Sequence, residues 1–454
     1  MVDNSLRGLI IAAPSSGSGK TTLTLALHRH FRNQGMKVAP VKTGPDYIDP
    51  AFHSTASGRP CYSMDSWAMR AETLRSVAEC ALLGTPEQDG ADWILAEGVM
   101  GLFDGGPGGA GSTASLAKLT GWPVVLVVDV MGMSASAAAL VHGFATFHRD
   151  VRVSGVIFNR VGSPRHARLL EEACEGLNIP ILGHVSRKED VALPERHLGL
   201  VQAAEHPEIE AFLDRAADQI SREVDCDALA RLAQDGQLAN PAPVTQEQPF
   251  LLPALGQRIA IARDVAYAFA YPAVLESWKA QGCELSFFSP LKDEAPAGNS
   301  DGIYLPGGYP ELYAGKLASS SLFMEGLRQA AGRGANIYGE CGGYMTLGKR
   351  LIDKHGQAHA MAGLLPVKTS FAVRKRALGY RQVECLADSV LGSAGSSYRA
   401  HEFHYSTVVG DEFDERTRPL FSVQDAAGTD LGQVGCQSGT VMGSYIHLLD
   451  RFVG

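Results

Sequence analysis

Residues 9–22 read LIIAAPSSGSGKTT, and this stretch decides the fold of the N-terminal half. An apolar run leads into a turn of serine and glycine, and a helical pattern begins after Lys20. A strand, a glycine-rich turn and a helix in this order are typical of a P-loop, whose backbone N–H groups bind phosphate. Pro14 departs from the usual pattern, which has glycine there. We therefore predict a nucleotide phosphate site formed by Gly17, Ser18, Gly19, Lys20, Thr21 and Thr22.

Short apolar runs alternate with helical patterns around this loop. The runs lie at 8–13, 37–41, 93–96, 124–128, 153–158 and 179–185, and segments 21–34 and 164–177 have helical patterns. Runs rich in valine, isoleucine and leucine without polar alternation are typical of strands covered on both faces. The sequence therefore predicts an α/β fold with a doubly wound parallel sheet.

A second α/β pattern begins at 258–262, after a polar stretch that contains Pro241, Pro243 and Pro249. Proline among polar residues is typical of a connection between domains. We predict a first domain at 1–236, a linker at 237–256 and a second domain at 257–454.

Several carboxylates follow the predicted strands of the first domain. Glu97 ends an apolar run, at the edge of the sheet where a P-loop needs a metal ligand, so we expect it to bind Mg²⁺ together with Thr21. Asp129 is a rival that we assign to capping a turn. Asp46 and Asp49 lie in a loop shaped by glycine and proline, where they could bind Mg²⁺, position a substrate or form an Asx turn. Asp104, in a glycine-rich loop beside Glu97, has the same alternatives.

The second domain contains a cysteine between glycines, in IYGECGGY at 337–344. We predict that a strand ends in a tight turn at Cys341 and that the helix after it lowers the pKa of the thiol. A thiol nucleophile needs a base, for which His447, after an apolar strand, competes with His401 and His404. Backbone N–H groups of a glycine turn suit an oxyanion, and we assign this role to Gly307, Gly308 and Gly342.

Composition limits the partners and the compartment. The 454 residues carry a formal net charge of −9 without a basic run, which argues against nucleic acid. Eight cysteines without a CxxC pair indicate reduced thiols. The strongest apolar stretch, 123–130, is too short to span a membrane, and the N-terminus lacks a signal-peptide pattern. We expect a soluble, cytoplasmic protein with no membrane partner.

The motifs of both halves resemble those of the cobyrinic acid a,c-diamide synthase family. The resemblance covers essentially the whole chain, and the motifs occur in the family's order. Those similar to class I glutamine amidotransferases are LPGG at 305–308, GECGGY at 339–344 and GSYIH at 443–447. Those similar to the synthases are SSGSGKTT at 15–22, GPDYIDP at 44–50, EGVMGLFDG at 97–105 and HEFHYS at 401–406.

The resemblance implies a dethiobiotin-synthetase-like P-loop domain and a C-terminal class I glutamine amidotransferase domain. It implies ATP- and glutamine-dependent amidation of the a and c carboxylates of a corrin in cobalamin biosynthesis, through an acyl phosphate. Cys341 would be the glutaminase nucleophile and His447 its base. Metal candidates are Thr21, Glu97 and one of Asp46 or Asp49, and the corrin would lie near Tyr47, Asp49 and Asp104.

The resemblance also has one departure. Ordinary class I amidotransferases have a glutamate two residues after the histidine, where this chain has Leu449, and Asp450 is out of register. We therefore expect a Cys-His dyad.

The sequence leaves other functions open. The same chemistry could act on another tetrapyrrole, such as a nickel-sirohydrochlorin. A P-loop switch ATPase with a partner-binding C-terminal domain would hydrolyse no glutamine, and a dethiobiotin-synthetase-like enzyme would not need residues 255–454. The choice between cobyrinic and hydrogenobyrinic acid, the order of the amidations and the oligomeric state, with a homodimer as one alternative, also stay open.

Overall fold

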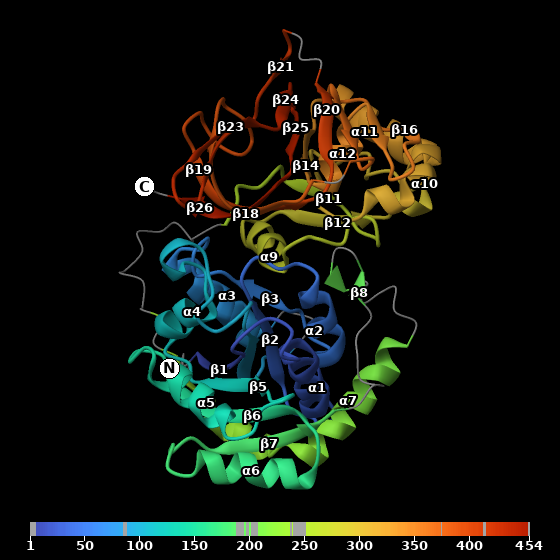
Figure 1. Cartoon of the computed structure of the whole chain (residues 1–454). Helices are drawn as coiled ribbons and strands as arrows, with labels where there is room; N and C mark the ends of the chain where they lie inside the picture. Colours follow the sequence, from blue (N-terminus) through green and yellow to red (C-terminus); the bar gives the residue numbers. More distant parts are fainter. Residues whose placement is uncertain are drawn as a thin grey trace. The chain divides into compact units, whose positions relative to one another are not determined.

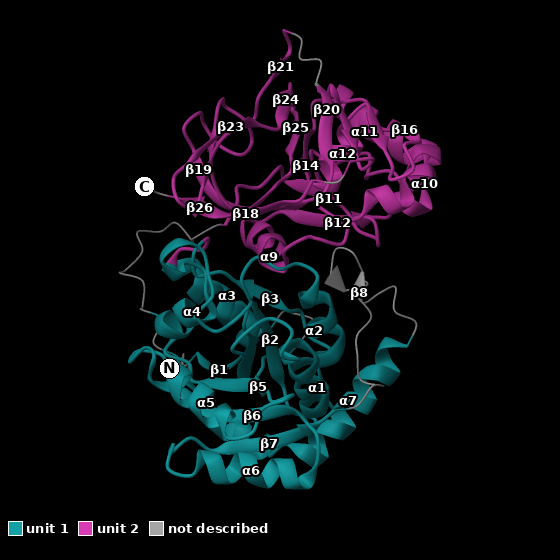
Figure 2. Ribbon diagram, in the orientation of Figure 1, with its two compact units in different colours: residues 1–67, 71–245 teal, residues 68–70, 246–454 magenta. Residues whose placement is uncertain are grey.

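The computed structural model describes residues 6–84, 89–187, 195–196, 199–200, 208–236, 238, 251–373, 375–411 and 415–452. It divides into two compact units, 1–67 with 71–245 and 68–70 with 246–454 (Figure 2). Of the predicted linker, only Leu238 and 251–256 lie within the described residues.

Unit 1 is built on a parallel sheet with the order β3-β2-β4-β1-β5-β6-β7 (Figure 1). In that order, its strands are Tyr62–Met64, Val38–Thr43, Trp93–Glu97, Arg7–Ala12, Val124–Asp129, Val153–Val161 and Ile181–Ser186. β10 (Gln234–Asp235) pairs antiparallel with β1, and β8 (Glu195–Arg196) with β9 (Gly199–Leu200). The doubly wound α/β prediction is confirmed, and it missed the short strand β3.

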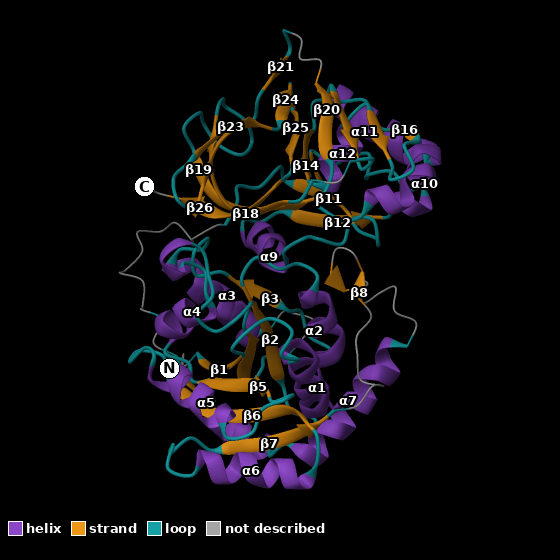
Figure 3. Ribbon diagram, in the orientation of Figure 1, coloured by secondary structure: helices purple, strands orange, loops and turns teal. Residues whose placement is uncertain are grey.

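Helices flank this sheet (Figure 3). They are α1 (Lys20–Asn33), α2 (Asp49–Ser57), α3 (Ala71–Leu83), α4 (Thr113–Thr120), α5 (Ser136–Thr146), α6 (Pro164–Cys174), α7 (Ile209–Glu223) and α8 (Cys226–Leu232), with a 3₁₀ turn at Pro107–Gly109. The central strands are buried on both faces, as their unbroken apolar sequences require. Because parallel strands end at the same edge, the segments after β1, β2 and β4 meet there.

Unit 2 combines a mostly parallel sheet with an antiparallel sheet and a mixed sheet. The main sheet has the order β12-β11-β13-β14-β25-β24-β21, and β12 to β25 are parallel neighbours. In that order, its strands are Glu284–Phe288, Arg258–Ala262, Gly302–Leu305, Asn336–Glu340, Val441–Ser444, Cys436–Ser438 and Thr417–Arg418. Its helices are α9 (Pro272–Ala280), α10 (Ala314–Ser319), α11 (Ser321–Gly332) and α12 (Gly342–Leu347), with 3₁₀ turns at Pro290–Lys292 and Pro310–Tyr313.

A 5-stranded antiparallel sheet has the order β23-β22-β18-β19-β26. Its strands are Asp430–Val434, Phe421–Asp425, Ala377–Cys385, Ser397–His404 and Ile446–Phe452. A 4-stranded sheet, β16-β15-β17-β20, consists of Ala358–Ala360, Arg350–Ile352, Val367–Ser370 and Thr407–Asp411. These sheets agree with the strand-rich C-terminal composition.

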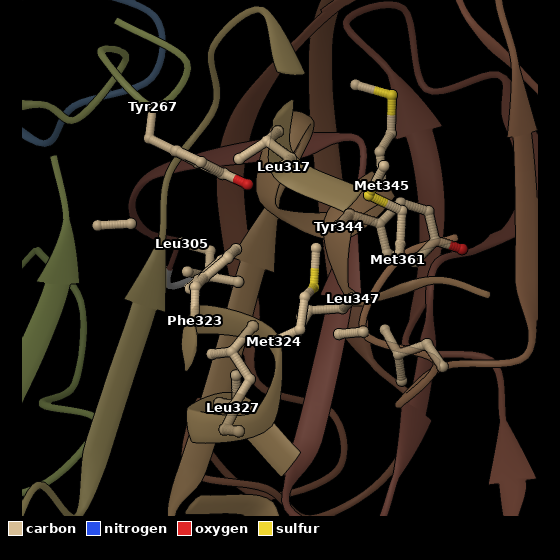
Figure 4. Close-up of a cluster of buried hydrophobic side chains, with 14 of the residues drawn as sticks. Tyr267, Leu305, Leu317, Phe323, Met324, Leu327, Tyr344, Met345, Leu347 and Met361 are labelled. Atoms are coloured by element: carbon tan, nitrogen blue, oxygen red, sulfur yellow. The ribbon is translucent and has the colours of Figure 1, made fainter. Parts of the chain in front are cut away.

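One apolar core holds α12 in place. Leu305, Leu317, Phe323, Met324 and Leu327 pack in the same cluster as Tyr344, Met345 and Leu347 of α12 (Figure 4). A buried side chain at each of these positions removes apolar surface from water and fixes the turn before α12. Within the described residues, none of the helices has the length and apolar character needed to cross a membrane.

Candidate active sites

The predicted phosphate loop is a turn between β1 and α1 that requires glycine. Gly17 and Gly19 have φ of 80° and 84°, in the left-handed region that favours glycine. A β-carbon on Gly19 would lie 2.2 Å from Asn159 Nδ2, and this amide donates to the Ser18 carbonyl at 2.9 Å. Asn159, in β6, therefore fixes the loop from another strand of the same sheet. Sequence analysis did not single it out, because nothing near Asn159 marks it as part of the loop.

Glu97, at the end of β4, lies against the start of α1. Its Oε1 accepts from Thr21 Oγ1 at 2.6 Å and lies 3.7 Å from Lys20 Nζ. Its Oε2 lies 2.5 Å from His53 Nε2. Burial alone would raise the pKa of Glu97, but Lys42, His53 and Lys20 together hold it well below its ordinary value. Thr21 and Glu97 thus present a hydroxyl and an ionised carboxylate side by side at the phosphate loop.

Lys42, in β2, is a charged side chain that sequence analysis did not assign. Its ammonium lies 2.5 Å from Asp49 Oδ2 and 3.0 Å from Glu97 Oε1, and the side chain is buried. Burial alone would lower the pKa of Lys42, but Asp49 and Glu97 outweigh it and raise this pKa. Burial lowers the pKa of Lys20, against the opposing effect of Glu97. Lys20 and Lys42 therefore both lie beside Glu97, next to the predicted phosphate loop.

The loop after β2 contains the Asx turn that was one alternative for Asp46. Asp46 Oδ1 accepts from the backbone N–H groups of Ile48 at 2.8 Å and Asp49 at 3.1 Å. Burial and the neighbouring Asp49 raise the pKa of Asp46 to about 7. Tyr47 is buried in the same loop, whereas Asp104 is exposed and accepts from the Gly101 N–H at 3.2 Å. Asp46 and Tyr47 thus lie in the loop after β2, Asp49 is the first residue of α2, and Asp104 lies in another loop.

Asp129, the rival of Glu97, lies at the end of β5. One of its oxygens accepts from the Met131 N–H at 3.0 Å, and the other pairs with Arg160. The turn-capping role predicted for Asp129 is confirmed by this hydrogen bond.

Cys341 lies at a strained turn between β14 and α12. Its φ of 47° is in a region that a residue with a β-carbon rarely adopts. Its N–H donates to the Ser444 carbonyl at 2.8 Å, which ties the turn to β25. Burial raises the pKa of the Cys341 thiol, Glu311 adds to this effect, and the Gly342 N–H opposes it. The first amide of the helix thus lowers this pKa as predicted, but burial outweighs it, so the net pKa of the thiol is raised.

Three of the predicted glycines surround this turn. A β-carbon on Gly342 would lie 3.0 Å from the Gly308 backbone N, so these two peptide groups are close neighbours. A β-carbon on Gly307 would lie 2.4 Å from His447 Cε1. The structure thus brings Gly307, Gly308 and Gly342 together with the predicted nucleophile and base.

His447 is fully buried in β26, and it is paired in register with His401 on the neighbouring strand β19. Burial, followed by His447 and Arg381, lowers the pKa of His401 to about 3. His404 stacks on Tyr445, with ring centroids 3.8 Å apart, and its Nε2 lies 2.8 Å from Glu402 Oε1. His401 is therefore held neutral beside His447, whereas His404 is paired with a carboxylate.

Two family models match parts of the chain. Residues 9–201 match the CobQ/CobB/MinD/ParA nucleotide binding domain, and residues 258–451 match the CobB/CobQ-like glutamine amidotransferase domain. Hydrogenobyrinate a,c-diamide synthase of Brucella anthropi is 50% identical over 98% of this chain and 99% of its own length. Those of Brucella abortus and Rhizobium meliloti are 51% and 50% identical over the same shares. The chain belongs to the family of these synthases.

Membership makes the chain a glutamine-dependent carbon–nitrogen ligase with an ATP-binding domain. The match at 9–201 contains the phosphate loop, Lys42 and Glu97, and the match at 258–451 contains Cys341 and His447.

One carboxylate of the second site was missed. Leu449 is buried, and Glu340 Oε2 lies 3.6 Å from His447 Nδ1. An acidic side chain therefore lies beside His447 although Leu449 stands at the position of the usual acid, and the Cys-His dyad stays a prediction. Glu340 directly precedes Cys341 in sequence, but an acid in that position is not part of the ordinary class I pattern, so sequence analysis passed over it.

Proposed function

We propose that this chain amidates the a and c carboxyl groups of hydrogenobyrinic acid, with ATP and with ammonia from glutamine. The observation that carries the proposal is the presence of both sites in one chain that is half identical to these synthases over 98% of its length. The ligase activity is assigned to residues 1–236 and the glutaminase activity to residues 257–454, joined by 237–256. The oligomeric state proposed is a homodimer, which light scattering after gel filtration would test.

A carboxylate accepts ammonia poorly, so the ligase site must activate it. Transfer of the ATP γ-phosphoryl group to the carboxylate forms an acyl phosphate, from which ammonia displaces phosphate. Residues Gly17 to Thr22 bind the phosphates, and Lys20 and Lys42 stabilise the negative charge on the transferring group. Tyr47, Asp49 and Asp104 are the residues proposed to contact the corrin. The eight cysteines, all within the described residues, are free thiols and form no disulfide, which fits a cytoplasmic enzyme.

The donor atoms at this site fit Mg²⁺. Among the described residues, no group of three or more His, Cys, Asp or Glu side chains could hold a metal ion. Mg²⁺ bound to a nucleotide needs fewer protein ligands, because phosphates and waters supply the rest. Thr21 and Glu97, whose oxygens are 2.6 Å apart, would hold it, with Asp46 as a further ligand. Bound Mg²⁺ supplies charge neutralisation at the phosphates.

The second site releases ammonia from glutamine. The Cys341 sulfur attacks the amide carbon, the carbon–nitrogen bond breaks, and His447 delivers a proton to the leaving nitrogen. The backbone N–H groups of Gly308 and Gly342 stabilise the negative oxygen of the tetrahedral intermediate. Water then hydrolyses the γ-glutamyl thioester to glutamate and the free thiol.

One assay tests the reaction and its substrate. Purified protein with ATP, Mg²⁺ and glutamine receives hydrogenobyrinic acid, cobyrinic acid or nickel-sirohydrochlorin in parallel, and products are weighed by mass spectrometry. We expect conversion of two carboxyl groups to amides on hydrogenobyrinic acid. If the protein amidated another tetrapyrrole faster, that compound would be assigned as the substrate instead. The absence of any glutamine hydrolysis would favour the P-loop switch ATPase.

A further inference from the structure

Glu340 is a buried acid whose carboxylate is held from two sides. It is the last residue of β14, is 1% exposed, and directly precedes Cys341. Tyr304 donates its hydroxyl to Oε2 at 2.7 Å, and the Leu448 backbone N–H donates to Oε1 at 3.1 Å. A buried carboxylate is costly unless it is hydrogen-bonded, and these two bonds fix its orientation.

The orientation that these bonds impose directs the carboxylate to His447. Glu340 Oε2 lies 3.6 Å from His447 Nδ1, and both side chains are buried. Leu448 follows His447 in β26, so the hydrogen bond to its N–H ties Glu340 to the strand that carries the base. Contacts of catalytic groups are often long in ligand-free structures and shorten when substrate binds.

The other acids near His447 are occupied or displaced. The position of the usual acid is Leu449, which is buried. Asp450 accepts from Arg70 Nη2 at 2.9 Å and from the Arg70 N–H at 2.9 Å. Glu402 pairs with Arg381 Nε at 2.7 Å and with His404. Of these carboxylates, Glu340 is the one placed at the Nδ1 side of His447.

We propose that Glu340 is the positioning acid of the glutaminase site, supplied from the residue before the nucleophile instead of from the strand after the histidine. The proposal rests on the glutaminase function proposed above. A carboxylate at Nδ1 favours the tautomer with its proton there, which leaves Nε2 free to accept the thiol proton. It also stabilises the imidazolium that forms when Cys341 ionises, as a triad acid does.

The charges around the thiol make this role testable. Burial raises the pKa of Cys341, and Glu311, Glu340 and Glu402 each add to that effect through their charge. If Glu340 acted only through its charge, neutralising it would make Cys341 ionise at lower pH. If it acts through His447, the imidazolium loses its support, and Cys341 ionises at higher pH. The two roles therefore predict opposite signs.

The experiment compares Glu340→Gln with Glu340→Asp and with the matched control Glu311→Gln. The rate of Cys341 alkylation by iodoacetamide is followed against pH by peptide mass spectrometry, with the Cys341→Ser protein as a blank. We expect the profile to move to higher pH in Glu340→Gln, to higher pH by a smaller amount in Glu340→Asp, which keeps the charge but shortens the side chain, and to lower pH in Glu311→Gln. A downward or absent shift in Glu340→Gln would overturn the proposal.

Kinetics provide the second readout. In Glu340→Gln, glutaminase kcat should fall about 10²–10⁴-fold with little change in the KM for glutamine, as for loss of a triad acid. Amidation with added ammonia should persist, which also shows that the variant folds. Unchanged kcat would contradict the proposal. If Glu340→Gln does not fold, Glu340→Asp is the deciding variant. Its carboxylate is one methylene shorter and lies farther from His447, so its kcat should fall at an unchanged KM.

The wild-type protein separates the two levels of inference. Without glutamine hydrolysis by the wild type, the proposed function fails and the role of Glu340 fails with it. With wild-type hydrolysis that Glu340→Gln retains in full, the proposed function stands and the role of Glu340 alone is wrong.

Discussion

Lys42 is the residue with the most demanding environment in the first site. Its ammonium is buried between Asp49 and Glu97, at 2.5 Å and 3.0 Å. Breaking a buried ion pair leaves an uncompensated charge, which is more costly than the pair itself was stabilising. A lysine at this position therefore has both a structural and a catalytic consequence.

Replacing Lys42 with Met should lower the free energy of unfolding by about 3–5 kcal/mol, because two carboxylates lose their partner in the interior. Amidation should be lost with either nitrogen source. The matched control is Lys37→Met, since Lys37 pairs with Asp89 at 2.8 Å on the surface and should contribute little. Urea denaturation followed by circular dichroism measures both, and equal effects of the two changes would contradict this account.

Asp46 makes stability depend on pH. Its pKa is about 7 in the folded protein, against an ordinary value of 3.8. Between these values the folded chain binds more protons than the unfolded chain, so stability is fully present below the window and falls as the pH rises through it. Asp46→Asn should remove this part of the pH dependence, measured by urea denaturation at pH values on both sides of the window.

A control of opposite sign is available for Asp46. Lys37 lowers the pKa of the exposed Asp89, so the stabilisation it contributes is lost as the pH falls. The Asp89→Asn variant should therefore still lose stability as the pH rises toward 7, as the wild type does. If the free energy of unfolding of Asp46→Asn depended on pH in the same way as that of the wild type, the pKa of Asp46 would not be raised by folding.

At the scale of elements, the turn between β14 and α12 depends on close backbone approach. A β-carbon on Gly343 would lie 1.9 Å from the Leu305 carbonyl oxygen, and one on Gly339 would lie 2.7 Å from the Gly343 carbonyl carbon. These contacts let α12 start directly against β13 and hold Cys341 at its strained φ. Strain of this kind persists where the surrounding structure over-determines it.

Gly343→Ala should therefore destabilise unit 2 by about 1–3 kcal/mol and lower glutaminase activity, because the added methyl group has backbone as its neighbour. Gly332→Ala, at the end of α11, is the matched control, since nothing lies within 4 Å of its added carbon. Thermal unfolding and glutaminase kcat would be compared. Equal melting temperatures for the two variants would show that α12 can move away from β13.

At the scale of the whole molecule, sequence periodicity and glycine motifs predicted the strands, the phosphate loop and the residues around the thiol. They did so because these features depend on neighbours in the sequence. Three of the residues that the sequence did not assign lie on strands and one, His53, lies on α2. The fold brings Asn159, Lys42, His53 and Glu340 to partners between 7 and 141 positions away in the sequence. The sign of the Cys341 pKa shift was also missed, because burial of the thiol is a property of the folded core and not of the turn.

Disabling each site separately in the intact chain should remove a different activity. Cys341→Ser should abolish amidation with glutamine and leave amidation with added ammonia, since the ligase site is unchanged. Lys20→Ala should abolish amidation with both nitrogen sources, because the phosphoryl group loses a stabilising charge, while glutamine hydrolysis persists. Product mass and glutamate release measured in the same reactions would check both. If Cys341→Ser kept its glutamine-dependent amidation, or if Lys20→Ala amidated normally, this assignment of one activity to each unit would be wrong.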